Sequence, residues 1–270
     1  MGCAMMKKGY RKTGRRISEC VLRLILCLYA LPVLALAAAS FTDGGNLPAP
    51  GASVRLSLQQ YADFFQSRDL LLSFRASGML AGGAVLLGLP VAVLGGFWLH
   101  HSRGRLARLF SLALTFSLLL PVQSTMVPVF RLSRWTGLYD RWLSVILLQV
   151  FSPLGPLAVF YLLRTVPDEH WEAALLDCGS LLRIYRKAIL PQLAPGLFLL
   201  ALLLFAEAWN LVEWPLILLP DPALRPASLS LNDLAPSGQT SFAAALLYSL
   251  PALLFSGALF CFSRDSFVPH

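Results

Sequence analysis

Long stretches without a charged residue, each rich in Leu and Ala, recur along the whole chain. Six of them lie between Arg23 and Asp43, Arg75 and Arg103, Arg108 and Arg131, Arg141 and Arg164, Lys187 and Glu207, and Asp233 and Arg264. A helix that crosses a membrane needs about 20 mostly apolar residues, so each stretch can hold one. A membrane β-barrel would instead show alternating apolar and polar residues in segments of about 10. The pattern predicts an all-α membrane protein with six transmembrane helices.

The predicted spans divide the chain into a simple order of segments. We place the spans near residues 21–40, 76–99, 106–128, 142–163, 194–219 and 242–263. A basic cytoplasmic tail covers 1–20, an external loop with a short helix covers 41–75, and a C-terminal tail covers 264–270. The last five spans form a core over 76–263 that includes a cytoplasmic loop at 164–192. Pro90, Pro121, Pro153 and Pro156 lie inside or near the ends of spans and favour a bent, packed bundle, because proline kinks a helix.

The short external helix rests on apolar residues at helical spacing. These are Leu58, Tyr61, Phe64 and Phe65. Two interpretations stay open: the helix lies on the membrane or on a partner, or it packs on the outer surface of the protein itself.

Composition and charge agree with a membrane protein. Hydrophobic residues make up 57% of the 270 residues and charged residues only 13%, which is more apolar surface than a soluble domain can bury. With both termini in the cytoplasm, 15 of the 22 Lys and Arg residues lie on the inner side, as the positive-inside rule requires. The net charge of +8 is therefore explained by membrane topology, and we expect no nucleic-acid partner. The first span also has the features of a signal peptide, but an uncleaved span fits this topology better.

No motif of catalysis, metal binding or disulfide formation stands out. The five cysteines, Cys3, Cys20, Cys27, Cys178 and Cys261, fall in predicted cytoplasmic or membrane segments, so no disulfide framework is implied. The four histidines have no metal-ligand spacing. Phosphate-binding loops, nucleophile turns and HExxH runs are also absent from the sequence. We therefore expect a protein that is not an enzyme and holds no cofactor.

The loop after the fourth span concentrates charge that the spans lack. It begins with Pro167, Asp168 and Glu169, which suit a helix N-terminus because acidic groups favour the exposed amides there. A second segment with basic residues follows and ends at Pro191 and Pro195, so we predict two short helices at a sharp angle. From the residues alone, the loop is either a docking surface for a soluble partner or a helix lying under the bilayer.

The run EAALLDCGSLLRIYRKAILP in this loop resembles the EAA loop of binding-protein-dependent ABC importer permeases. Matching positions are Glu172, Ala173, Ala174, Asp177, Leu190 and Pro191. Cys178 stands where the family has glycine, with Gly179 one place later, and Ala188 replaces an isoleucine, so the turn is shifted by one residue. The resemblance implies that these residues form coupling helices that fit into a cleft on an ATP-hydrolysing subunit.

The resemblance extends over roughly residues 55–268 and is strongest to the second, maltose-type permease of carbohydrate importers. Supporting segments are QQYADFFQS, LLSFRASGML, LLLPVQSTMVPVFRLSRWTGLYDRW and AEAWNLVEWPLILL. It implies the type I importer (MetI-like) bundle and a hetero-dimer with a second permease subunit. It also implies a dimer of ATPase subunits that carry ATP and Mg²⁺, an external solute-binding protein and surrounding membrane lipid.

Polar residues in the fifth span are candidates for the solute path. Glu207, Asn210 and Glu213 recur every three residues, which would place them on one helix face, and Trp209 and Trp214 are possible stacking surfaces for a sugar ring. The alternative is structural: Asn210 bonds a neighbouring helix, Glu213 lies at the outer boundary, and tryptophan belongs at interfaces.

Other functions remain as alternatives. The same machinery could carry a polyamine, a phosphate ester or a metal complex. A secondary transporter would need intramembrane ion ligands, of which the sequence has few. An intramembrane enzyme is disfavoured because catalytic constellations are missing.

Overall fold

A computed structural model of the chain describes residues 27–28, 30–42, 56–102, 104–167, 169, 171, 181–234 and 241–266. Helices make up nearly all of this part, and its one β contact is an isolated antiparallel bridge between Thr42 and Leu56. The described residues fall into two compact units. The first takes in Met1–Ser67 and Leu234–Leu250, and the second takes in Arg68–Asp233 and Pro251–His270. The prediction of an all-α protein is confirmed for the described part.

Three helices of the described part are long and apolar enough to cross a membrane. They are α3 (Arg68–His101), the 22-residue segment Trp142–Leu163, which comprises α6 (Trp142–Val150) and α7 (Leu154–Leu163), and the 25-residue segment Tyr185–Trp209. Two shorter apolar helices are Ala30–Ser40 and Phe242–Phe255, the latter within α13 (Phe242–Ser266). Six spans are consistent with this arrangement and stay a prediction.

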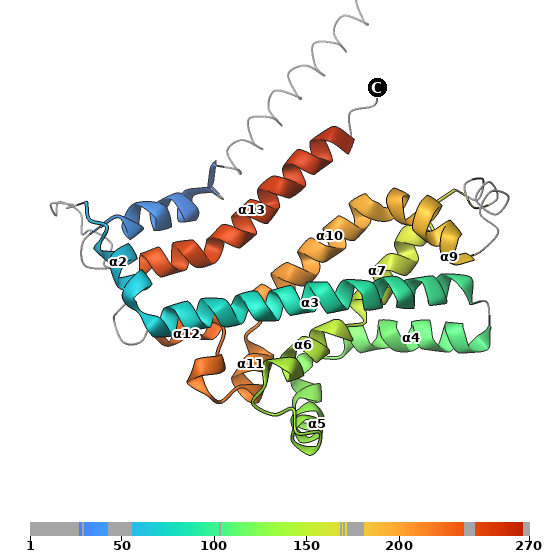
Figure 1. Cartoon of the computed structure of the whole chain (residues 1–270), viewed down its shortest axis with the longest axis horizontal. Coiled ribbons are helices and arrows are strands. Elements are labelled where there is room, and N and C mark those ends of the chain that lie inside the picture. The colour runs from blue at the N-terminus through green and yellow to red at the C-terminus, as the bar shows by residue number, and fades with distance from the viewer. Residues whose placement is uncertain are drawn as a thin grey trace, which may run out of the picture. The chain divides into compact units, whose positions relative to one another are not determined.

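The third predicted span, 106–128, is not one straight helix. The structure has α4 (Arg105–Leu119) and α5 (Val122–Trp135), bent by 107° at Leu120 and Pro121. Leu120 is extended, with φ −73° and ψ 128°. The residue before a proline is pushed out of the helical region by the proline ring, so Pro121 ends α4. Figure 1 shows α5 turning away from α4.

The fifth predicted span, 194–219, starts earlier and ends earlier than the sequence indicates. Helix α9 (Leu181–Ile184), a π-helical turn (Tyr185–Ile189) and α10 (Leu190–Trp209) follow one another without a gap. Pro191 lies in the first turn of α10, where a proline is tolerated, and so it does not separate a second short helix from the span. After Trp209 the chain breaks and forms the short α11 (Glu213–Leu218).

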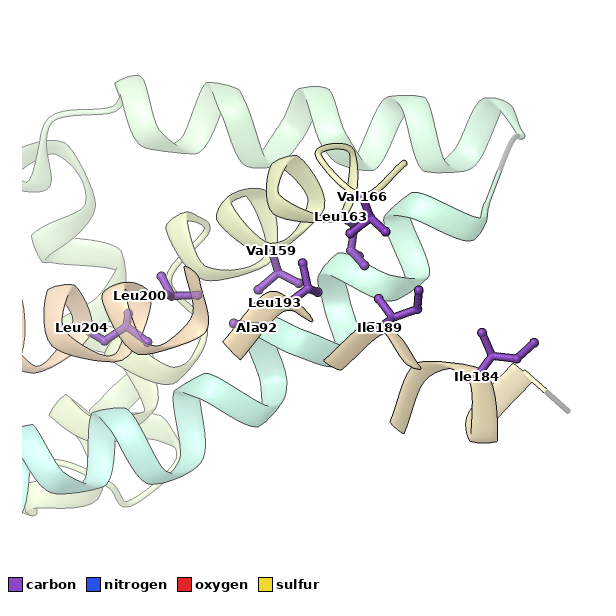
Figure 2. Packing of buried hydrophobic residues seen from close by; sticks show 9 residues of the cluster. All are labelled: Ala92, Val159, Leu163, Val166, Ile184, Ile189, Leu193, Leu200 and Leu204. Carbon is purple, nitrogen blue, oxygen red and sulfur yellow. The ribbon is translucent and has the colours of Figure 1, made fainter. Parts of the chain in front are cut away.

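Helix α3 is the element on which the second unit is packed, with α7 and α10 against it (Figure 1). A buried apolar cluster joins the three helices and continues into the π turn (Figure 2). Its residues are Ala92, Val159, Leu163, Val166, Ile184, Ile189, Leu193, Leu200 and Leu204. The contact between α3 and α7 is closest at Gly96, where an added Cβ would lie 2.5 Å from Val159 Cβ. Small residues permit this approach of the two backbones.

A second apolar cluster holds the segment after α10 against α3 and α6. Leu80, Val145, Leu211, Leu218 and Leu219 form it. Two long-range hydrogen bonds add to the packing: the backbone amide of Ala227, in α12 (Ala227–Leu234), donates to Ser77 Oγ at 2.9 Å, and Trp142 Nε1 donates to the Leu224 carbonyl at 2.9 Å. The irregular chain between α10 and α12 is thus fixed by contacts on both sides.

One buried glutamine of α2 (Gln59–Gln66) holds the segments of the first unit together. Gln60 Nε2 donates to the carbonyls of Ala39 at 3.1 Å and Thr42 at 2.8 Å, and Gln60 Oε1 accepts from the amide of Ala243 at 3.2 Å. These bonds connect the end of the helix before Thr42, helix α2 and the start of α13. The structure thus has a short helix where one was predicted, and its buried residues, Gln60 and Phe64, pack on the protein itself. Its external location stays a prediction.

Replacing Gln60 should destabilise the first unit more than replacing its neighbour. In Gln60→Ala, the Thr42 carbonyl and the Ala243 amide lose their buried partner, at about 1–3 kcal/mol for a buried group left unpaired, whereas the Ala39 carbonyl still accepts from Thr42. Thermal unfolding of the purified protein in detergent should show a clear decrease of stability. Gln59→Ala is the matched control, because Gln59 is exposed and its side-chain amide donates to Asp63 within the same helix. Equal stabilities of the two variants would contradict this role of Gln60.

Close packing of α3 on α7 predicts different effects for two glycines of the same helix. In Gly96→Ala the new methyl group would meet Val159, which is fully buried and β-branched and so cannot turn away. Overpacking of this kind costs about 1–3 kcal/mol. Gly82→Ala adds a methyl group with no atom within 4 Å and should stabilise α3 by up to about 1 kcal/mol. Unfolding of both variants in detergent checks this, and a neutral Gly96→Ala would disprove the close contact.

Candidate functional site

The described end of the loop that we predict to be cytoplasmic is a basic helix surface. Arg183, Arg186 and Lys187 are exposed and recur at the spacing of one helix face. Leu190 and Pro191 lie next to them in a groove of about 430 Å³ that also contains Leu89 of α3. Other predicted coupling residues lie outside the described residues, namely Glu172, Ala173, Ala174, Asp177, Cys178 and Gly179.

This basic surface belongs to the same continuous helix as the fifth span. Helix α9, the π turn and α10 follow one another without a gap, so Arg183, Arg186 and Lys187 lie directly before the predicted membrane-spanning part of α10. The sequence pattern missed this continuity, since it treated Pro191 and Pro195 as the point where a new helix starts.

A mostly apolar groove of about 690 Å³ runs between α7, α10 and the second half of α13. Its polar lining residues are Tyr161 and Thr165 on the side of α7, and Asn210 at the end of α10. The remaining lining includes Ala158, Leu199, Leu203, Ala206 and Phe255. All of these elements belong to the second unit, so the groove is a feature of one compact body.

Trp209 lies at this groove but is buried in packing. Its ring stacks on Phe205, with centroids 5.6 Å apart, and meets Phe74 edge to face at 6.4 Å. The side chain is only 7% exposed. Trp214 is likewise packed against the second apolar cluster. The structure thus gives both rings a packing role, and Trp209 is too buried to present the open face that stacking on a sugar would need.

Glu207, Asn210 and Glu213 do not share one helix face, contrary to the sequence prediction. Helix α10 ends at Trp209, and Asn210 Nδ2 donates to the Ala206 carbonyl at 2.8 Å, beside the Asn210 amide at 3.1 Å. A side chain that binds the last carbonyls of a helix competes with further helical turns. Glu213 then begins a separate helix, α11. Only Glu207 is inside α10, and its side chain is exposed.

The depth of Glu207 in the predicted membrane can be estimated from the contact between Leu204 of α10 and Gly88 of α3. A Cβ placed on Gly88 would lie 3.9 Å from Leu204 Cδ1, and Gly88 is near the middle of α3 and of its predicted span at 76–99. Glu207 is three residues further along α10, about 4.5 Å by helical rise. An ionisable group at this depth faces a bundle interior or a water-filled path rather than lipid.

Comparison with known proteins gives one family and several relatives. The profile of the family described as "Binding-protein-dependent transport system inner membrane component" matches residues 84–265. The sn-glycerol-3-phosphate transport system permease of Pectobacterium atrosepticum is 28% identical over 172 residues, 62% of this chain and 61% of that protein. The glucose import system permease of Saccharolobus solfataricus is 28% identical over 166 residues, 59% of this chain and 56% of that protein.

The fold also has a counterpart among solved structures. One chain of a bacterial ABC transporter involved in the import of the acidic polysaccharide alginate matches with a TM-score of 0.76 at 19% identity. The match covers 94% of this chain and 98% of that chain. By sequence, however, the chain spans only about three fifths of the length of the relatives it matches.

Proposed function

Because the chain belongs to the family of binding-protein-dependent transport system inner membrane components, we propose that it is a permease subunit of an ABC-type importer. It forms one half of the path by which a solute crosses the membrane. A separate ATPase subunit hydrolyses ATP with Mg²⁺, and this chain itself catalyses no reaction and holds no cofactor. Both termini lie in the cytoplasm, as the distribution of Lys and Arg favours.

One observation supports this path: Glu207 is an exposed residue at the depth of the predicted membrane. Leu203, one turn before it on the same face, is 50% exposed, so this face of α10 is open in the single chain. In the assembled importer the face is covered by water or by a second permease, because lipid would disfavour the charge. Glu207 and Asn210 then border the path, while Trp209 supports the wall from behind. Glu213 lies beyond the helix end, at the outer entrance.

A second permease subunit and lipid account for the apolar surface of α4. In this 15-residue helix Ala107 is the one buried residue, and Leu106, Phe116 and Leu119 are each at least 70% exposed. Exposure of this extent in an apolar helix needs lipid or another apolar helix as its surroundings. We assign the partners of the chain accordingly: a second permease subunit, two ATPase subunits on the cytoplasmic loop, and an external solute-binding protein.

The cargo that we propose is a sugar or an oligosaccharide. Support comes from the functions after which similar proteins are named, which include import of glucose and of alginate. A phosphate ester is the second candidate, since the similar protein of Pectobacterium belongs to a transport system for sn-glycerol-3-phosphate. The two differ in charge, and the proposed path residues, a carboxylate and an amide, favour a neutral polyol over a phosphate because like charges repel.

Cysteine labelling tests whether Glu207 borders a water-filled path. In a variant of the assembled importer without native cysteines, Glu207→Cys should react with a membrane-impermeant maleimide, because thiolate forms only in contact with water. Leu204→Cys is the matched control on the same helix and should stay unreacted, since Leu204 is 3% exposed. Labelling at equal rates, or at neither position, would remove Glu207 from the path.

Substitutions in the coupling loop test the proposed function as a whole. Glu172→Lys or Ala174→Trp should decrease the rate of solute uptake at least about tenfold. The reason is that a reversed charge or a large ring prevents docking of the ATPase subunit. Membrane insertion should be unchanged. Uptake is measured with labelled oligosaccharides and with glycerol 3-phosphate in parallel, so the same experiment separates the two cargoes. Normal uptake by both variants, or a wild-type protein from which no ATPase subunit co-purifies, would contradict the proposal.

A further inference from the structure

Four rings meet where the cytoplasmic loop reaches the end of α3. Trp171, the residue before Glu172, stacks on His100 with centroids 5.2 Å apart and planes at 17°. Trp171 also meets Tyr185 edge to face at 5.4 Å, and Tyr185 stacks on Phe97 at 4.1 Å. The rings come from three segments: the loop, the last turns of α3, and the π turn before α10.

These rings extend the membrane core to the loop. Phe97, Trp171 and Tyr185 pack against the apolar cluster that joins α3, α7 and α10. Ile184 and Ile189, which border the π turn, are members of that cluster (Figure 2). An unbroken series of packed side chains therefore runs from the residue next to Glu172 into the centre of the second unit.

In the part of the chain that the structure describes, Tyr185 is held in this place by ring packing. Its hydroxyl is buried and has no hydrogen-bond partner within the described residues. The contacts that place Tyr185 among the described residues are therefore those of its ring, with Trp171 and Phe97. Tyr185 also opens a π-helical turn, a form that occurs mainly as single turns at functional sites.

We propose that Trp171, held between His100 and Tyr185, is the joint that fixes the coupling loop to α3. A displacement of the loop by the ATPase subunit then moves α3 together with α10, instead of being absorbed by the chain between Val166 and Leu181. Stacked and edge-to-face rings resist sliding because their favourable geometry is narrow. The three are positioning residues for coupling. This inference rests on the proposed function and adds to it the route by which the loop reaches α3.

The test compares solute uptake per ATP hydrolysed in the assembled importer reconstituted in lipid vesicles. Trp171→Ala removes the ring that touches both His100 and Tyr185, and it should lower this ratio by about two- to tenfold. Trp171→Phe and Tyr185→Phe should retain the ratio, since an aromatic ring remains and the Tyr185 hydroxyl makes no bond in the part of the chain that the structure describes. Trp98→Ala is the matched control. Trp98 is on α3, as His100 is, but its ring packs edge to face on Phe110 of α4, with centroids 5.4 Å apart. It should leave the ratio unchanged.

A second variant keeps the inference testable if Trp171→Ala does not assemble. His100→Ala removes only one outer partner of Trp171, and we expect a smaller decrease of the same ratio. Where Trp171→Ala assembles, adding His100→Ala to it should cause little further decrease, because the stacking between the two rings is already absent. A wild-type ratio in His100→Ala, or an equal decrease in Trp98→Ala, would overturn the joint. If ATPase subunits co-purify and drive uptake while Trp171→Ala couples normally, the joint fails and the proposed function stands.

Discussion

Two helices can come within touching distance of their backbones only where side chains are nearly absent, and the second unit depends on such an approach. At Gly96 of α3 and Val159 of α7 a single additional carbon would overlap its neighbour. Gly155 of α7 meets Ala92 of α3 in the same way, with 2.7 Å between an added Cβ and Ala92 Cβ. Because lipid offers no hydrophobic advantage to buried leucines, this close packing supplies much of the contact energy between membrane helices. Helix α10 then packs on the same surface of α3, and the loop beyond it becomes connected to the core.

The places where helices break are as informative as the places where they pack. The chain breaks at Leu120 because a proline follows, and at Asn210, where the side-chain amide binds the Ala206 carbonyl in the last turn of α10. Irregular backbone at membrane depth is tolerated only where protein or water covers it. The segment after Asn210 meets this condition through Ser77, Ser228 and Trp142, whose side chains bond backbone groups of that segment or its neighbours. Both breaks lie beside surfaces that we assign to the solute path or to partners.

Much of the architecture could be predicted from runs of uncharged residues. The span predicted at 142–163 agrees with the helical segment Trp142–Leu163, and the span at 76–99 lies inside α3. The pattern was less informative where a helix continues past the membrane or stops inside it. Pro191 indicated a boundary that the structure does not have, since proline is harmless in a first turn. Glu207, Asn210 and Glu213 were assigned to one face because their spacing is helical, but spacing carries no information about a capped helix end.

The sequence by itself determined the class of protein, because hydrocarbon accepts only long apolar helices and because Lys and Arg resist translocation. It also located the charged loop to which we assign coupling, since a block of charges between two apolar spans is visible without coordinates. Only the tertiary structure decided which side chains meet. Phe97 and His100 lie far from Trp171 and Tyr185 along the chain, and no periodicity relates the two pairs. Their contact depends on how α3 and α10 pack, and that packing is set by interactions between distant segments rather than by local pattern.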